Sequence, residues 1–542
     1  MVTQKHSGMK KIPLSYSINI GLILWLLMGC STIHAQKFST KLVPSVSKSI
    51  TANMDIRYYT ELLGTSSAKG IEKQFAPLQN TDITTVVCAP MSWRFYNYPS
   101  SVDLTWKEPN LFPRATNLYP AWNNMIKNLQ NGGDPLKDAL TYTRKIGKRF
   151  VVNIRMNDSH YIYNPLFPTH NNFWRSHPEY KLGSSKITQV TDTSAVFNYL
   201  VPEVRDFYFK IIEEICTNYD VDGIELDFQR APIYFHQKDI DTGRPIMTDY
   251  VKRIRDLLTR IGKQKNKQLE LNVRALQTVK ANYDIGLDVL NWDKAGLISG
   301  ITVSPHYINT TDVGIEEFVA KRKNARIFGE INSINYQRGG GTGHEVQDRR
   351  YVSPENYRAA ILSFLERGAD GISFFNTYTI PAASLKVLST GLLSNLKDIN
   401  KLKQADKVYS TYANNGTMFG KIFPAKDEAT YEVYIADDIR GNFKNAVIRF
   451  ETNSPNDKNE IEAWINGTKL QEYQSENSEL FSPIIVTTAY ANKKNLRFFT
   501  IPLSALKFGS NQVHVKNLSR RPRCTFISSE LALYANAGKQ TQ

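Results

Sequence analysis

The stretch Asp222-Gly223-Ile224-Glu225-Leu226-Asp227-Phe228 alternates acidic and apolar side chains along one predicted β-strand. Successive side chains of a strand point to opposite faces, so Glu225 and Asp227 share one face while the three apolar side chains share the other. Burying two acids on so short a strand is costly unless they are paired or functional. The stretch therefore predicts a strand that packs its apolar face on helices and turns its acids the opposite way.

Seven further short segments combine apolar residues with turn signals at their ends. In chain order, the eight predicted strands are 85–89, 150–155, 196–200, 223–228, 269–274, 300–304, 326–331 and 371–376. Helical patterns with apolar residues at i, i+3 and i+4 separate most of them, as in 204–219, 249–262 and 354–368.

This eightfold alternation predicts an α/β fold, a (β/α)8 TIM barrel over residues 81–398, after a polar lead-in over 36–80. A doubly wound open sheet is the alternative. It is disfavoured because no Gly-rich phosphate loop follows the first strand.

The sequence pattern changes near residue 400. Short alternating segments separated by turn signals, such as Asn466-Gly467, predict an all-β sandwich over residues 405–538. The run Ala463-Trp464-Ile465-Asn466-Gly467, followed by Gly509-Ser510-Asn511-Gln512-Val513, resembles galactose-binding-like jelly-roll modules. The resemblance implies a jelly roll that either binds glycan or serves as a structural appendage.

Residues 1–35 have the pattern of an export signal, in which Lys10 and Lys11 precede the apolar run 18–28. The run Leu27-Met28-Gly29-Cys30 resembles a lipobox, while 33–36 is compatible with ordinary signal cleavage. We therefore expect an exported protein, either secreted or held at the periplasmic or outer-membrane surface by a lipidated Cys30.

The formal net charge of +16 favours an anionic partner, although basicity also aids solubility. Because the basic residues are dispersed, an acidic or sulfated glycan is expected rather than a nucleic acid. Cys30, Cys88, Cys216 and Cys524 show no metal-binding spacing, and Cys88 and Cys216 are expected as small buried residues. No metal or organic cofactor is expected.

Active sites of (β/α)8 barrels lie at the C-terminal ends of the strands, where Asp227 and Glu330 are placed by the predicted strands. Glycoside hydrolysis uses two carboxylates that flank one bond. Asp227 is expected to be the general acid/base and Glu330 the nucleophile or base, with Glu225 tuning their pKa values. A structural ion pair is the alternative for these acids; Arg155, Arg230 and Arg274 are the cations available for it.

Polar and aromatic residues recur at or just beyond the other strand ends, where sugar-binding groups are expected. The predicted substrate-binding residues are Arg155, Asn157, Asp158, His160, Asn198, Arg230, Arg274, His306 and Asn376, with Trp93, Tyr234, Tyr307 and Tyr378 as stacking platforms. Two other functions stay open. They are a non-catalytic glycan-binding surface lipoprotein, and a polysaccharide lyase with a Tyr or His base beside Arg155.

Five motifs are similar to those of glycosyl-hydrolase-like barrel proteins of polysaccharide-degrading bacteria, a group known as family 10-like. The motifs cover 150–158, 173–179, 198–205, 222–228 and 286–292, within a resemblance that extends over about residues 80 to 390. The resemblance implies a (β/α)8 fold and action on a polysaccharide or oligosaccharide. It implies no particular sugar, because one fold supports many activities.

Overall fold

The computed structural model describes most of the chain after residue 48. The described residues are 49–56, 67–108, 120–162, 164, 167, 170–183, 195–305, 309–339, 346–376, 391–412, 422–423, 428–452, 460–473, 480–481, 496–518 and 524–536. Within them, no helix is both long and apolar enough to cross a membrane.

Eight parallel strands close into a barrel in the order β1-β12-β9-β8-β7-β6-β5-β2, as the (β/α)8 prediction requires. The strands are β1 (Ser49–Asp55), β2 (Thr85–Ala89), β5 (Arg149–Arg155), β6 (Gly223–Asp227), β7 (Glu270–Leu276), β8 (Gly300–Ser304), β9 (Arg326–Asn332) and β12 (Gly371–Phe375). Two hairpins, β3 (Met91–Ser92) with β4 (Phe95–Tyr96) and β10 (Ile334–Gly339) with β11 (Val346–Tyr351), follow β2 and β9.

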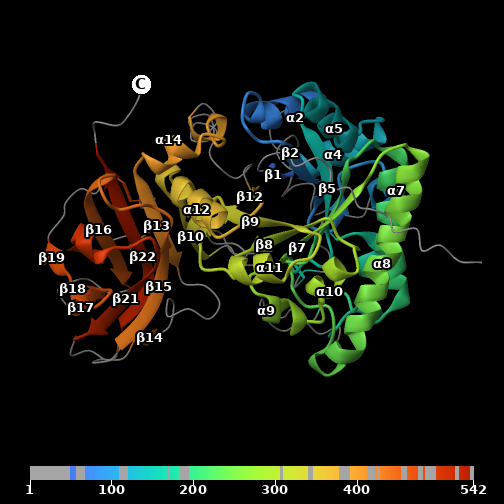
Figure 1. Cartoon of the computed structure of the whole chain (residues 1–542). Helices are drawn as coiled ribbons and strands as arrows, with labels where there is room; N and C mark the ends of the chain where they lie inside the picture. The colour runs from blue at the N-terminus through green and yellow to red at the C-terminus, as the bar shows by residue number, and fades with distance from the viewer. Residues whose placement is uncertain are drawn as a thin grey trace, which may run out of the picture. The chain divides into compact units, whose positions relative to one another are not determined.

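Helices connect the barrel strands, and Figure 1 shows the long α7 and α8 on the outside of the barrel. The helices are α2 (Ser67–Phe75), α4 (Pro120–Gln130), α5 (Pro135–Lys145), α6 (Asn172–Ser176), α7 (Pro202–Asn218), α8 (Ile240–Gln264), α9 (Val279–Tyr283), α10 (Val289–Lys294), α11 (Ile315–Lys321), α12 (Pro354–Glu366) and α14 (Ile399–Lys403). Their starts follow local chemistry. α12, for example, begins at a capping box formed by Ser353 and Asn356, with Pro354 at its first position.

The first barrel strand is β1, which lies inside the segment predicted to be a lead-in. The barrel therefore begins at Ser49, and the predicted start at residue 81 is wrong. β1 pairs with β2 on one side and with the last strand, β12, on the other. Its sequence Ser-Ile-Thr-Ala-Asn-Met-Asp alternates polar and apolar residues as the stretch 222–228 does.

The predicted strand 196–200 does not form. A single isolated bridge joins Phe197 to Lys181, and the chain then turns. Asn198 holds this turn, because its side chain accepts a hydrogen bond from the backbone of Leu200 (3.0 Å) and its carbonyl accepts one from Val201. Helix α7 begins directly afterwards at Pro202.

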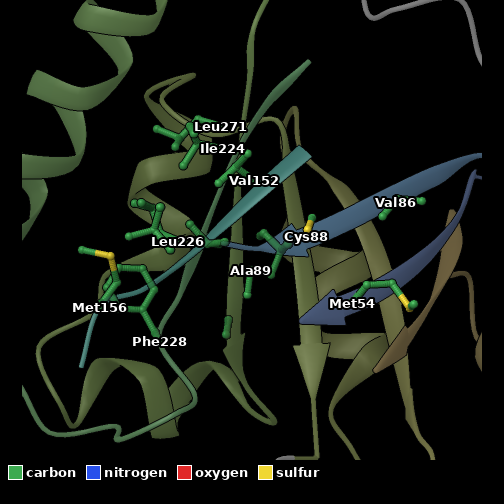
Figure 2. Packing of buried hydrophobic residues seen from close by; sticks show 14 of the residues in the cluster. Met54, Val86, Cys88, Ala89, Val152, Met156, Ile224, Leu226, Phe228 and Leu271 are labelled. Carbon is green, nitrogen blue, oxygen red and sulfur yellow. The ribbon is translucent and has the colours of Figure 1, made fainter. Parts of the chain in front are cut away.

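The outer face of the barrel carries the main hydrophobic core, as the alternation in 222–228 predicts. Ile224, Leu226 and Phe228 are completely buried in this core. Val152, Ile224 and Leu271 are register partners on three neighbouring strands, and Figure 2 shows their side chains close together. The acids of β6 therefore point to the interior of the barrel.

The region after residue 405 consists of two antiparallel sheets, in agreement with the predicted all-β sandwich. The strands are β13 (Lys407–Tyr412), β14 (Ile422–Phe423), β15 (Glu428–Ile435), β16 (Phe443–Thr452), β17 (Ile461–Ile465), β18 (Thr468–Lys469), β19 (Gln471–Tyr473), β20 (Leu496–Thr500), β21 (Gly509–Asn517) and β22 (Cys524–Ala535). Ile448 and Leu531 of one sheet share a hydrophobic core with Ile465 and Val513 of the other.

Cys88 and Cys216 are buried free thiols, as predicted, and burial raises the pKa of both. The predicted export signal and Cys30 lie outside the described residues. Export and lipidation therefore stay predictions.

The substitution Met54→Ala tests the place of β1 in the barrel. Met54 is fully buried in the barrel core, so its truncation is expected to lower the free energy of unfolding by about 2–5 kcal/mol in urea denaturation. Lys69→Ala, at an exposed position of α2, is the control. A Met54→Ala change below about 0.5 kcal/mol, the range of surface substitutions, would contradict the assignment of β1.

Candidate active site at the barrel mouth

Arg274 of β7 links the two acids that were predicted to carry the chemistry. Its Nη1 donates to Oδ1 of Asp227 at 3.0 Å, and its Nε and Nη2 donate to the two oxygens of Glu330 at 2.5 and 2.8 Å. Ser304, at the end of β8, accepts from Arg274 (2.9 Å) and donates to Glu330 (2.6 Å). These side chains form one buried charge cluster, called here the Arg274 cluster.

Burial and pairing act against each other in the Arg274 cluster. Burial lowers the pKa of Arg274, but Asp227 and Glu330 outweigh it, so that the pKa lies above its ordinary value. Burial raises the pKa of Glu330, while the Arg274 guanidinium and the Ser304 hydroxyl favour its charged form. The cluster therefore places a permanent cation between two carboxyl groups with little exposure to water.

The two carboxyl groups differ in how fully they are bonded. Both oxygens of Glu330 accept hydrogen bonds from Arg274, and Oε1 also accepts one from Ser304. In Asp227, both hydrogen bonds go to Oδ1, one from Arg274 and one from the backbone N–H of Gln229 (2.9 Å). Among the described residues, Oδ2 of Asp227 has no hydrogen-bond donor. Asp227 is thus held in place by one oxygen and keeps the other for a further interaction.

The structural ion pair considered as an alternative is present, because Arg274 bonds both acids. Asp227 and Glu330 were expected to flank one glycosidic bond; in the structure one guanidinium group joins them. Arg274 is consequently a positioning residue for the acids. The prediction that it binds the sugar does not fit its bonding.

Glu225 lies deeper in the barrel than Asp227, because it precedes it by two residues on β6. Its carboxyl group accepts hydrogen bonds from Asn153 (2.8 Å) and Thr302 (3.3 Å). Burial, together with the charge of Asp227, raises its pKa to about 7, against the opposing hydrogen bond from Asn153. Glu225 is therefore mostly uncharged below neutral pH.

A second charge cluster surrounds Arg155 at the end of β5. Arg155 bonds Asp55, the last residue of β1, at 2.5 Å and Asp158 at 3.4 Å. Asp158 also contacts Nδ1 of His160 at 2.6 Å. Three of the four predicted residues 155, 157, 158 and 160 are thus joined in one network, with Asp55 as a member that the predicted site lacked.

Three predicted binding residues act within the protein itself. Asn157 uses its side chain to bond the backbone of Phe197 and Ile233, and Asn198 uses its side chain in the turn before α7. The hydroxyl of Tyr234 donates to the carbonyl of Phe228 (2.8 Å), and its ring is buried. For Asn157 and Tyr234, the predicted contact with substrate does not fit their bonding and burial; for the half-buried Asn198 it stays a prediction.

The remaining predicted residues line the mouth or lie outside the described part of the chain. The Phe375 ring is contacted by the guanidinium of Arg274 at 3.7 Å and that of Arg230 at 5.5 Å. Asn376 follows Phe375 and is mostly buried, while Trp93 is half-buried beside His160. His306, Tyr307 and Tyr378 lie outside the described residues.

The mouth contains four residues that the predicted site lacked. They are Asp55, Tyr161, Ser304 and Phe375. A sequence signal existed for Asp55, because residues 49–55 alternate as the stretch 222–228 does. Ser304 ends the predicted strand 300–304 and Phe375 is the second-last residue of the predicted strand 371–376, yet no motif marked either as a site residue.

Comparison with known proteins leaves the family open. No family model and no curated protein matches the chain, so the family 10-like resemblance stays a prediction. Among solved structures, the chain is similar to alpha-L-fucosidase isoenzyme 2 from Paenibacillus thiaminolyticus (13% identity, TM-score 0.41, 65% of this chain and 49% of that chain). The PgaB (BpsB) glycoside hydrolase domain from Bordetella bronchiseptica gives 8% identity and a TM-score of 0.41, covering 63% of this chain and 98% of that chain.

The endo-beta-1,4-mannanase from Thermotoga petrophila is a further example, at 9% identity and a TM-score of 0.39, covering 89% of this chain and 97% of that chain. The chain thus spans about half the length of the fucosidase and nearly all of the other two. Similarity at this level does not identify an activity.

The raised pKa of Glu225 predicts a pH-dependent stability difference between wild type and Glu225→Gln. When folding raises the pKa of a carboxyl group, the free energy of unfolding of the protein falls as pH rises. For Glu225 this fall runs from its unfolded pKa to its folded pKa of about 7. Urea unfolding at about pH 5 and about pH 8 is expected to show the variant gaining stability relative to wild type at the higher pH. Glu203→Gln, at an exposed position of α7, should show no such trend, and an equal difference at both pH values would contradict the raised pKa.

Proposed function

We propose that the protein is a glycoside hydrolase acting on a polysaccharide or oligosaccharide at the C-terminal mouth of the barrel. The observation that carries the proposal is Asp227, a buried strand-end carboxylate bonded to Arg274 through one oxygen only. A carboxylate that is held by a guanidinium in a site with little water, and that has one oxygen without a described hydrogen-bond donor, suits the positive charge that develops at the anomeric carbon.

In this proposal, Asp227 is the nucleophile. Arg274 and the N–H of Gln229 hold Oδ1, which leaves Oδ2 to attack the anomeric carbon. The guanidinium and the N–H of Gln229 fix the direction of the carboxylate, so little reorganisation is needed during the reaction. This assignment differs from the sequence-based one, which made Asp227 the general acid/base.

Glu330 takes a positioning role in the proposed site. Its two oxygens receive three hydrogen bonds, so it orients Arg274 and has no oxygen left without a donor. Glu225 precedes Asp227 by two residues on β6 and lies deeper in the barrel. It is mostly uncharged below neutral pH, which limits charge repulsion between the two carboxyl groups.

The pairing of the arginines at the mouth bears on the charge of the substrate. Arg155 is bonded to two carboxylates and Arg274 to two more, so neither offers a net positive charge to an anionic sugar. Arg230 is the further predicted arginine at the mouth, beside Phe375. We therefore propose a neutral or weakly anionic glycan, and keep export and the role of the sandwich as predictions.

Release of reducing sugar from a broad panel of glycans tests the proposed activity. Asp227→Asn is expected to lower kcat/KM by about 10³-fold or more, because it removes the nucleophile. Glu330→Gln is expected to cause a smaller loss through disorder of Arg274. Asp256→Asn, on the exposed face of α8, is the matched control and should leave the rate unchanged.

Three outcomes would count against this function. Binding without turnover across the panel would favour the non-catalytic glycan-binding protein. A product that absorbs in the ultraviolet because it is unsaturated would favour the lyase. An Asp227→Asn variant with wild-type turnover would remove the proposed nucleophile.

A further inference from the structure

His160 and Asp158 form a dyad on the loop that follows β5. Nδ1 of His160 lies 2.6 Å from Oδ1 of Asp158, which also accepts the backbone N–H of His160 at 2.8 Å. The Asp158 side chain is almost completely buried, whereas 26% of the His160 side chain is exposed. The dyad therefore has a buried carboxylate at one end and an accessible imidazole at the other.

Asp158 is suited to orient the imidazole because it is held in its charged form. Burial raises its pKa, but His160, Arg155 and Arg94 lower it well below its ordinary value. An ionised carboxylate at Nδ1 accepts the Nδ1 proton, so the neutral ring carries its lone pair on Nε2. The nitrogen that exchanges protons is then the one turned away from Asp158.

Two residues beside the dyad, Trp93 and Tyr161, and one after β12, Asn376, have unusual backbone conformations. Trp93, Tyr161 and Asn376 have φ values of 57°, 55° and 53°, and each follows the C-terminal end of a barrel strand or its adjoining loop. The Trp93 ring lies 5.9 Å from that of His160 and 5.1 Å from that of Tyr161, measured between centroids. A left-handed backbone conformation is costly for bulky residues, and residues in such conformations cluster at functional sites.

The dyad belongs to the same mouth as Asp227. Arg155, which bonds Asp158, is the register partner of Asp227 on the neighbouring strand. The backbone N–H of Met156, just before the loop of the dyad, donates to the carbonyl of Asp227 (3.0 Å). The mouth therefore holds an oriented imidazole and a carboxylate whose Oδ2 has no donor among the described residues.

We propose that His160, oriented by Asp158, is the proton-transfer residue of this site and works opposite Asp227. The proposal rests on the glycoside hydrolase function and supplies what Glu330 lacks, an accessible group that exchanges protons. A neighbour of the dyad, the half-buried Trp93, is placed to stack against the sugar on the leaving-group side.

The two steps balance as follows. The imidazolium gives its Nε2 proton to the glycosidic oxygen, which receives the electron pair of the breaking C–O bond, while Oδ2 of Asp227 bonds to the anomeric carbon. Neutral His160 then takes a proton from water, whose oxygen attacks the same carbon and releases the Asp227 carboxylate. The second step restores the imidazolium.

The charges around His160 set the pH range of the first step. Asp158 lies on its own loop, Arg155 at the end of β5 and Arg230 after β6, while Arg94, after β3, donates to the carbonyl of His160 (3.0 Å). Burial lowers the pKa of His160, Asp158 raises it, and Arg230 and Arg155 lower it, with the result below the ordinary value. Cleavage that needs the imidazolium should therefore weaken as pH rises through a pKa that lies below the ordinary value of a histidine.

Leaving-group dependence tests the proposal with His160→Gln. Two substrates of the same sugar are compared. The 4-nitrophenyl glycoside has a good leaving group, and the unactivated glycan, followed by release of reducing sugar, has a poor one. Loss of the proton donor should lower kcat/KM about 10²- to 10⁴-fold for the unactivated glycan and much less for the nitrophenyl glycoside, whose leaving group departs unprotonated. His177→Gln, at a partly exposed histidine paired with Glu179, is the matched control.

A pH profile of the unmodified protein supplies a second test that does not depend on a variant. The rate on the unactivated glycan should fall as pH rises through the lowered pKa of His160, and this limb should be absent with the nitrophenyl glycoside. Asp158→Asn should shift that pKa, as expected of a positioning residue.

Equal losses on both substrates in His160→Gln, or no loss on either, would overturn the role of His160 while leaving the hydrolase function in place. A wild-type protein inactive on every glycoside would instead overturn the hydrolase function, and the role of His160 with it.

Discussion

The ion pairs of Arg274 are the interaction on which the mouth of the barrel depends. Arg274 and Asp227 are register partners on neighbouring strands, and Arg274 reaches Glu330 two strands further on. Because all three side chains are buried, removal of Arg274 would leave two carboxyl groups without their cation, at a cost of about 3–5 kcal/mol. The same contacts that keep the barrel interior stable also leave a single carboxylate oxygen of Asp227 available for chemistry.

The Arg274 cluster is one part of a barrel whose interior is polar along much of its length. Below it, Asn153 and Thr302 bond Glu225, and at the other end of the strands Glu270 bonds Arg149 (3.0 Å) and Arg326 (2.8 Å). Hydrophobic stabilisation comes from the other face of the strands, which packs on the helices. This division allows the interior to carry charge, provided that each charge is paired.

The sequence predicted correctly which side chains of β6 point into the barrel, but it did not predict which charged side chains pair with one another. Alternation in 222–228 placed the acids inside and the apolar residues outside, because this depends only on the period of a strand. The apolar character of 196–200 was misleading, since Asn198 and Pro202 impose a turn and a helix start. Arg274 was one of three candidate partners, and the choice depended on the barrel register, which single residues do not encode. The missed β1 and the false strand offset each other, so β6 and β9 kept their places in the order.

The pairing of β1 with β12 has a consequence for how the chain reaches this fold. Thr51 donates to the carbonyl of Ile372, a contact that spans 321 residues. The first strand to leave the ribosome therefore has no partner on one edge until the last barrel strand has been made. Contacts of such long range form slowly and leave apolar strands open in the meantime. Barrel closure is thus a late event. Until it occurs, the unpaired edge of β1 is open to aggregation.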